Sequence, residues 1–543
     1  MESTAPQDQR VSNNYETNTE VSMDECTPIT SSEPSSPKVA VQTHLAKVGF
    51  FASAVAVAAW TARMAFDPRS QRFAMTFPDS FDYFDVARLG PLRFGEFFFG
   101  RRPFGYPLFI WALGVTPGRV VTVQVILYAL AWLYLITTVL RIWRSKVVAG
   151  ITALILLLLG LLPKYSVWSV NTLSEGLALT STVAAVGAWL RWAAWPDRRR
   201  VITVTIMSLA WISLRDSNAV NILVVGGAVF GILMLRWFLG KKGSTPTARP
   251  TALPTVPPTT SVTPEAQEDQ QDQQDQEDLS KDSVAKTNVS SRALLRGQPL
   301  AMALVALLGF SLYQLVSQTV SQRGRYSTFN TIGRDVLPNP ELSKYFFEHG
   351  MPNPPALAAR TGKDSWADGP DSWLLNPQLA GFRKWADSEG RKLVARALIV
   401  KSPVFWNKLT HDWKTYNGDG SRDYDTLGAY GRTPSVPGRH TLISLSFTNL
   451  LFSCLGGFGI AIALANSRRD LRMAILGGLL SLAAVFDIYV CYVGDADERY
   501  RHIISGYLRL DLAALLAVSW AMDRVICRLT TLRANERLGT ATT

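Results

Sequence analysis

The apolar residues of this chain are gathered into long runs that alternate with polar and charged segments. The clearest runs are Gly118–Leu140, Val147–Leu162, Asn218–Leu239 and Thr441–Asn466. Runs of about 18 or more apolar residues with few charges are typical of membrane-spanning helices. The fold class that we predict is therefore an all-α polytopic membrane protein with about ten transmembrane helices. The predicted spans are residues 48–66, 118–140, 147–163, 172–192, 200–214, 218–239, 298–319, 441–466, 471–493 and 503–522.

The charges between these runs predict how the chain is oriented. Cytoplasmic loops of membrane proteins carry an excess of Lys and Arg. With a cytoplasmic N-terminus, the segments expected on that side are all basic, namely 141–146, 191–200, 236–296, 467–472 and the tail from Arg524. Because topology accounts for much of the net charge of +12, we expect a lipid bilayer and no nucleic acid as partner. The arginines of the outer loop 67–117 do not follow this rule.

Polar stretches divide the chain. Residues 1–45 are rich in Ser, Thr, Asn, Pro and Glu, and 241–297 contain a Pro/Thr-rich part followed by a Gln/Asp/Glu-rich part. Neither has apolar periodicity, so we expect a disordered cytoplasmic tail and a disordered cytoplasmic linker. Residues 523–543 are expected to form a cytoplasmic C-terminal tail.

Two membrane modules are expected between these polar parts. The first, residues 46–240, has about six helices and carries the outer loop 67–117. The second, residues 298–522, has about four helices and carries the outer loop 320–440. That loop holds several tryptophans and a predicted helical stretch at 377–409, so we expect it to be partly helical.

Ionisable side chains next to the predicted spans form the candidate site. Asp79, Asp82 and Asp85 follow the first apolar run, and on a helix Asp79, Asp82 and Tyr83 share one face. Ionisable groups at membrane depth are costly and are candidates for function. The residues that we expect to line an outward-facing cavity are Tyr83, Glu175, Arg215, Asp216, Asp487, Glu498 and His502. Arg499 and Arg501 are expected on the same side of the membrane.

Structural interpretations compete with this one. Asp79 and Asp216 are also suited to cap a helix N-terminus. Glu175 stands three residues after Thr172, which is the spacing of a capping box. The five histidines are scattered and the four cysteines lack metal-site spacing, so no zinc site is predicted.

A carboxylate beside a wet cavity suits a general base, and arginine suits phosphate because its planar fork binds two oxygens. Together these groups fit transfer onto a hydroxyl from a phosphate-bearing donor. Four motifs carry a family resemblance: Pro78-Asp79-Ser80-x-x-Tyr83-x-x-x-Ala87, Arg102–Leu108, Asn171–Glu175 and Asp497–His502. The order of these motifs, and their expected location on one side of the membrane, resemble the GT-C superfamily of integral membrane glycosyltransferases. The resemblance is to a bacterial branch that is similar to protein mannosyltransferases and aminoarabinose transferases.

The resemblance implies a GT-C-like bundle in the bacterial cytoplasmic membrane. It implies inverting transfer of a sugar from a polyprenyl-phosphate donor to a hydroxyl of an envelope glycan or glycolipid. Asp79 takes the position of the general base, while Arg499 and Arg501, and after them Arg101 and Arg102, are candidates for the donor phosphate. Many members have adjacent or alternating acids in the first loop. The spacing Asp79-x-x-Asp82-x-x-Asp85 leaves open which aspartate is the base and whether a divalent metal takes part.

Two rival functions remain open from the sequence. A transporter or lipid flippase also places ionisable residues in helices, although the two predicted modules show no evident repeat. A catalytically inactive scaffold is the other, because fold alone does not fix function.

Overall fold

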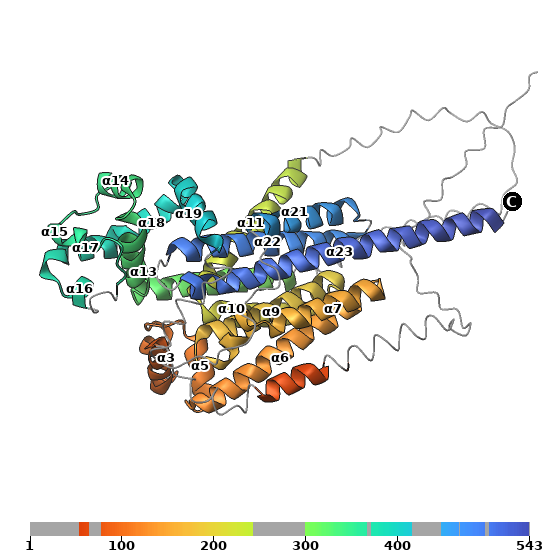
Figure 1. Ribbon diagram of the computed structural model, residues 1–543, viewed down its shortest axis with the longest axis horizontal. Coiled ribbons are helices and arrows are strands. Elements are labelled where there is room, and N and C mark those ends of the chain that lie inside the picture. The colour runs from red at the N-terminus through yellow and green to blue at the C-terminus, as the bar shows by residue number, and fades with distance from the viewer. Residues whose placement is uncertain are drawn as a thin grey trace, which may run out of the picture. The chain divides into compact units, whose positions relative to one another are not determined.

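The structure is a computed structural model that describes residues 51, 54–63, 78–242, 299–365, 371–414, 447–465, 467–494 and 499–541 (Figure 1). These residues form helices and connecting turns without a strand, which confirms the all-α prediction for this part of the chain. The predicted tail 1–45 lies outside the described residues. So does the linker 241–297, apart from its first two residues, which end a helix.

Within the described residues, four helices are long and apolar enough to cross a membrane: α6 (Pro117–Ile142), α9 (Ser174–Ala194), the helix Pro299–Val320 and α22 (Arg468–Gly494). A fifth span results if α7 (Lys146–Leu161) and the segment Lys164–Val170, bent by 57°, are counted as one. The protein is therefore a multi-pass membrane protein by the length and composition of its helices.

The prediction of about ten spans is not confirmed. Helices do occur at four other predicted positions, in α10 (Arg198–Leu214), α11 (Asp216–Lys242), α21 (Phe447–Ala463) and α23 (Arg499–Ala541). The predicted span 48–66 lies partly outside the described residues, and its described residues 51 and 54–63 are helical. Both α10 and α21 have 17 residues, which is the lower limit of length for a span.

The membrane helices pack in two groups that meet at α9. In the first group, α6 packs against α7 and α9, and α9 packs against α10; in the second, α22 and α23 lie along each other and against α21 (Figure 1). A Cβ atom added at Gly506 of α23 would lie 2.6 Å from Cγ1 of Ile488 on α22. Glycine thus permits the close approach of α22 and α23, as small residues commonly do between membrane helices.

The basic loop 467–472 has a structural role. Arg469 donates a hydrogen bond to the carbonyl oxygen of Ile142, 2.7 Å away, and Arg472 donates one to that of Ala193, 2.9 Å away. These carbonyls are at the ends of α6 and α9, where helical carbonyl groups lack partners in their own helix. The two arginines therefore join the start of α22 to the ends of the first group of helices.

The segment 320–414 is folded into short helices in its described parts, which agrees with the expected partly helical loop. The predicted stretch 377–409 corresponds to η3 (Pro377–Leu379), α17 (Ala380–Trp385), η4 (Ala386–Gly390), α18 (Arg391–Val400) and most of α19 (Ser402–Lys414). Trp373, which precedes this stretch in the segment 320–414, serves packing, since its ring stacks on Phe329 with ring centroids 5.2 Å apart.

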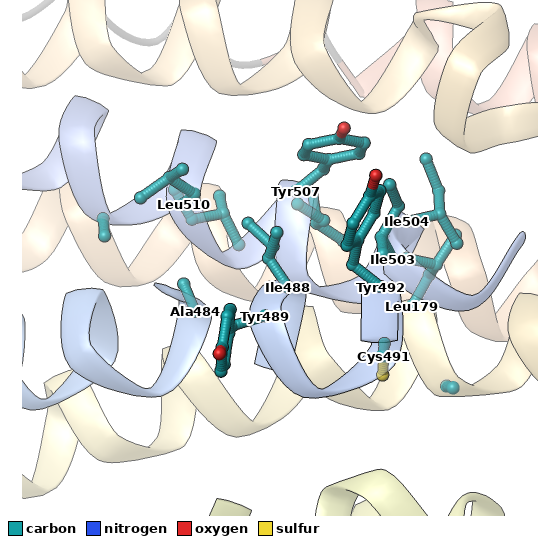
Figure 2. Close-up of a cluster of buried hydrophobic side chains, with 14 of the residues drawn as sticks. Leu179, Ala484, Ile488, Tyr489, Cys491, Tyr492, Ile503, Ile504, Tyr507 and Leu510 are labelled. Atoms are coloured by element: carbon teal, nitrogen blue, oxygen red, sulfur yellow. The ribbon is translucent and has the colours of Figure 1, made fainter. Parts of the chain in front are cut away.

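Aromatic residues of α22 dock this segment onto the membrane helices. Tyr489 stacks on Trp406 at 4.5 Å and donates a hydrogen bond to the carbonyl oxygen of Leu398 at 2.7 Å. The hydroxyl of Tyr492 donates to Asp412 at 2.5 Å. Figure 2 shows Tyr489 and Tyr492 beside the buried apolar side chains that join α22 to α23.

Candidate functional site

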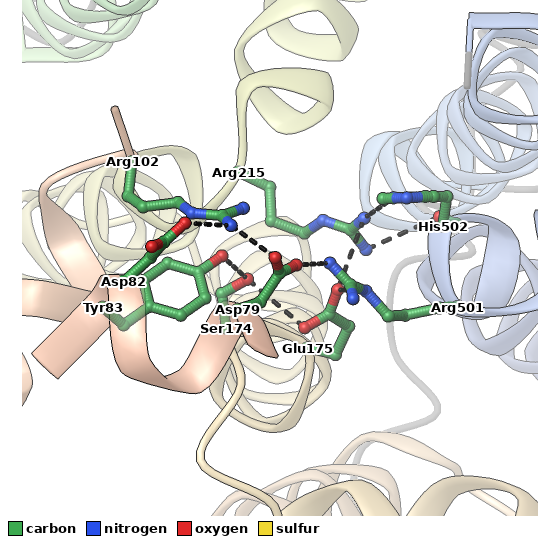
Figure 3. Close-up of polar contacts among 9 residues, drawn as sticks. All are labelled: Asp79, Asp82, Tyr83, Arg102, Ser174, Glu175, Arg215, Arg501 and His502. Carbon is green, nitrogen blue, oxygen red and sulfur yellow. Dashed lines mark hydrogen bonds and ion pairs between the residues drawn. The ribbon is translucent and has the colours of Figure 1, made fainter. Parts of the chain in front are cut away.

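The segment that opens the candidate site forms α3 (Pro78–Leu89), with Asp79 in its first turn. Asp79 and Asp82 lie one helical turn apart and both accept hydrogen bonds from Nη2 of Arg102, the bond to Asp82 being 2.8 Å long. The second oxygen of Asp79 accepts a hydrogen bond from Nη2 of Arg501 (Figure 3). One carboxylate thus lies between two guanidinium groups that come from distant parts of the chain.

Glu175 extends this network from the first turn of α9. Its Oε1 accepts a hydrogen bond from Nε of Arg501 at 2.8 Å and lies 3.8 Å from Nη2 of Arg215. Arg215, between α10 and α11, donates in turn to Nδ1 of His502 at 2.8 Å (Figure 3). Arg501 therefore bridges Asp79 and Glu175, and Arg215 joins Glu175 to the first turn of α23.

Tyr83 supports the same cluster through its ring and its hydroxyl. The guanidinium of Arg102 lies over the ring at 5.1 Å, and the hydroxyl is 2.9 Å from Oγ of Ser174. A cation over an aromatic face is attracted by the ring quadrupole. Tyr83 therefore helps to hold Arg102 against Asp79, and it links α3 to the start of α9.

Exposure falls along this cluster. The side chain of Asp82 is 45% exposed and that of Asp79 is 23% exposed, whereas that of Glu175 is 2% exposed. A ligand can therefore reach the cluster from the end of Asp82, Arg102 and Asp79. Glu175, Arg501 and Arg215 form its buried end.

The arginines dominate the electrostatics at Asp79. Burial raises the pKa of this carboxyl, but the guanidinium groups of Arg501 and Arg102 outweigh burial and hold the pKa well below its usual value of 3.8. Burial, together with the positive charges of Arg501 and Arg215, lowers the pKa of His502 well below 6.5. His502 is therefore neutral near pH 7, and Asp79 is ionised but a weak base in this state.

Charges within the cluster are balanced. The carboxylates of Asp79, Asp82 and Glu175 face the guanidinium groups of Arg102, Arg215 and Arg501. An entering phosphate would have to compete with these carboxylates for arginine. Among the described residues, no group of three His, Cys, Asp or Glu side chains is placed to hold a metal ion.

Several predicted site residues lie elsewhere. Asp85, expected as a second alternative base, forms an exposed pair with Arg88 at 2.6 Å, because it points away from the face that carries Asp79. Arg101 is exposed, while its neighbour Arg102 enters the cluster. Glu498 lies outside the described residues.

Other predicted residues belong to separate ion pairs. Asp216 forms a two-bonded pair with Arg323, with distances of 3.1 and 2.9 Å. Asp487 accepts hydrogen bonds from Arg509 and from Asn221, the latter at 2.7 Å. Both aspartates, which the sequence predicts to line the cavity, are thus bound to arginines other than Arg102 and Arg501.

Arg499 is also separated from the cluster around Asp79, although it is only two residues before Arg501. It donates a hydrogen bond to Asp335, which Lys408 also contacts. Asp335 and Lys408 were missed in the sequence, because no pattern in the segment 320–414 distinguishes them from solvated charges.

The sequence also allowed helix-capping roles for Glu175 and Asp79, but the carboxylates of both bind arginine side chains. Helix α9 begins at Ser174 and its N-cap residue is Leu173, so Glu175 stands two residues after the cap, not three as in a capping box. The carboxylate of Glu175 binds arginine instead. Both oxygens of Asp79 are likewise bound to guanidinium groups.

Gln124 of α6 holds the segment that precedes α9 and Glu175. The sequence did not single it out as a site residue. Its Nε2 lies 3.1, 3.0 and 2.9 Å from the carbonyl oxygens of Trp168, Ser169 and Asn171. Its Oε1 accepts a hydrogen bond from Tyr106 at 3.1 Å. The available signal was an amide side chain within an apolar helix.

Comparisons of the chain with protein-family models, with curated proteins and with solved structures give no match. The resemblance to the GT-C superfamily therefore rests on the motifs of the sequence alone.

Proposed function

We propose that this protein is a membrane glycosyltransferase, which moves a sugar from a polyprenyl-phosphate donor to a hydroxyl of a cell-envelope acceptor. The observation that carries the proposal is the position of Asp79, a partly accessible carboxylate between the guanidinium groups of Arg102 and Arg501. A candidate base and two candidate phosphate ligands are thereby assembled at one point beside the membrane helices.

The proposed reaction is a displacement at the anomeric carbon of the donor. The acceptor oxygen forms a bond to this carbon, and the bond between the carbon and the phosphate oxygen breaks. The acceptor proton passes to Asp79, and the electron pair leaves with the polyprenyl phosphate, whose charge arginine neutralises. Such a leaving group needs no strong acid.

The low pKa of Asp79 requires a further step. While two guanidinium groups bind it, this carboxylate is a weak base. The donor phosphate competes for the same guanidinium groups, so donor binding draws at least one of them away and raises the pKa of Asp79. In this proposal, the donor creates the base that it needs.

Donor consumption is the test. Purified protein in nanodiscs is given a panel of polyprenyl-phosphate sugars with a crude envelope acceptor, and release of the polyprenyl phosphate is measured. Consumption of one donor with a covalently modified acceptor supports the proposal. If the folded protein turns over none across the panel with acceptors from several envelopes, the proposal fails.

A transporter or flippase is the second candidate, favoured by the buried Asp487 and Arg509. Their side chains are 0% and 2% exposed in α22 and α23, and ionisable residues within membrane helices often mark transport pathways. Flux of a lipid-linked or free substrate across proteoliposomes, abolished by Asp487→Asn and without a covalent product, would establish this function instead.

A further inference from the structure

The turn between α3 and α4 (Phe94–Phe98) exposes two large apolar side chains. Gly90 has a φ of +71°, a conformation that favours glycine, and Pro91 follows it, so the chain turns sharply after α3. At the tip of this turn, residues 90–94, Leu92 is 100% exposed and Phe94 is 62% exposed. Contact of apolar surface with water is unfavourable, so this tip is expected to be covered.

The tip is attached to the end of a membrane helix. The carbonyl oxygen of Phe98, the last residue of α4, accepts hydrogen bonds from the hydroxyls of Tyr313 at 3.0 Å and Ser317 at 2.8 Å. Both donors lie in the last turns of the helix Pro299–Val320, and Tyr313 is about 10 Å from its end at a rise of about 1.5 Å per residue. Phe94 packs on Phe98 with ring centroids 4.9 Å apart. The tip therefore lies beside the end of this helix, at the depth of the lipid headgroups.

Two arginines flank the tip and can bind an anion there. Arg93 lies between Leu92 and Phe94, and its pair with Glu96 is 3.4 Å long, with side chains that are 63% and 60% exposed. An exposed pair of this kind contributes little, so it does not prevent Arg93 from binding another anion. Arg101 follows α4, is exposed and forms no ion pair with another described residue.

This combination indicates anionic lipid as the group that covers the tip. Large apolar side chains beside cations are typical of segments that lie in the bilayer interface, where the apolar part enters the acyl boundary and the cations meet the headgroups. The guanidinium group suits phosphate, because it can donate two parallel hydrogen bonds to it. A soluble partner would have to bring an apolar surface into the headgroup layer, where lipid is already present.

We propose that Leu92 and Phe94 insert into the bilayer and that Arg93 and Arg101 bind the phosphate groups of anionic phospholipids. The arginines of this loop, which do not follow the rule for cytoplasmic loops, thereby gain a role. The site does not depend on the proposed transfer reaction, because it involves none of the residues that contact Asp79.

Spin labels measure the depth of the tip in the full-length protein in nanodiscs. A nitroxide is attached to Leu92→Cys after Cys26 and Cys527 are replaced by serine; the other two cysteines are buried. Collisions are measured with oxygen, which concentrates in lipid, and with a nickel chelate, which stays in water. Reference labels are placed at Val316, 54% exposed on the helix Pro299–Val320, and at Glu389 of η4, whose side chain is 58% exposed.

We expect the label at position 92 to collide more often with oxygen than with the chelate, as the label at Val316 does. More frequent collisions with the chelate, as at Glu389, would overturn the proposal. Few collisions with both reagents would also overturn it, since protein rather than lipid would then cover the tip.

The same label tests the choice of lipid. Nanodiscs of phosphatidylcholine are compared with nanodiscs of phosphatidylcholine and phosphatidylglycerol in equal amounts. We expect the anionic lipid to raise the ratio of inserted to free tips about fivefold, and high salt to reduce this gain. No gain with the anionic lipid would refute the role of the arginines.

Substitutions assign the gain to the two arginines. Arg93→Gln combined with Arg101→Gln should abolish it. The matched control, Lys344→Gln combined with Lys392→Gln, removes exposed cations that pair with glutamates of the segment 320–414 and should keep it. All four side chains are exposed, so both variants are expected to fold. Variants that respond alike to the anionic lipid would refute the site.

Discussion

Arg501 lies 422 positions after Asp79 in the sequence and donates a hydrogen bond to its carboxylate. The same guanidinium binds Glu175 of α9, so the first turn of α23 joins the acidic segment after the first apolar run to the membrane helices. Because one cation serves two carboxylates, loss of Arg501 would leave both in close proximity without their shared partner. Site geometry and local stability are therefore coupled at this residue.

Asp79→Asn is the first prediction. The variant keeps the size of the side chain but removes its basicity, and its amide nitrogen can no longer accept a hydrogen bond from one of the two arginines. We expect the rate of sugar transfer to fall at least about a hundredfold, the range for loss of a general base. The matched control is Asp85→Asn, the same change on an exposed position of the same helix, which should retain the unmodified rate. A fully active Asp79→Asn variant would move the base to Asp82.

The pair of Asp79 and Arg501 is expected to show strong energetic coupling. A double-mutant cycle with Asp79→Asn and Arg501→Gln, measured by chemical unfolding in micelles, should give a coupling free energy of about 1–3 kcal/mol. The side chain of Arg501 is 6% exposed, so solvent screens the pair weakly. In the control cycle of Asp85 and Arg88, both exposed by more than 60%, we expect below about 1 kcal/mol. Similar values in the two cycles would contradict the proposed role of Arg501.

The sequence predicted most helices because their signal is local. Apolar runs and their basic flanks placed α6, α9, α22 and the helix Pro299–Val320 close to their observed bounds. Helical periodicity also placed Asp79 and Asp82 on one face of α3, where Arg102 binds both. Whether each helix crosses the bilayer depends on its packing and tilt, which composition alone does not give.

The sequence did not predict which charged residues of the site pair with each other. Arg499 and Arg501 are almost adjacent and were assigned one role, yet they bind aspartates of different regions, Asp335 and Asp79. Side chains two positions apart on a helix do not face each other. Which partner each one meets depends on how the segment 320–414 docks onto α22, and no local pattern encodes that.

Acidification is expected to destabilise the protein through His502. Its pKa in the folded protein is well below 6.5, because burial and the charges of Arg501 and Arg215 oppose protonation. The unfolded chain therefore binds more protons than the folded one, and stability should fall as the pH drops below about 6.5. His502→Gln should remove this part of the pH dependence. The measurement is the thermal unfolding temperature of both proteins from pH 7.5 to 5; parallel curves would refute the prediction.

The proposed release of Asp79 by the donor makes a prediction about pH and rate. In the free protein the pKa of Asp79 is far below 3.8, so its protonation should not reduce kcat/KM between pH 5 and 7. In the donor complex, loss of an arginine partner raises this pKa, and kcat reports the complex. We therefore expect kcat to fall at a higher pH than kcat/KM as the solution is acidified.

His502→Gln is the background for this measurement, since it removes the imidazole of the cluster, whose protonation would otherwise contribute to the loss of activity at acid pH. In that variant, kcat should still fall at a higher pH than kcat/KM as the solution is acidified. If kcat and kcat/KM fell at the same pH, Asp79 would keep both arginines in the donor complex. It would then have to act by positioning the acceptor rather than by taking its proton.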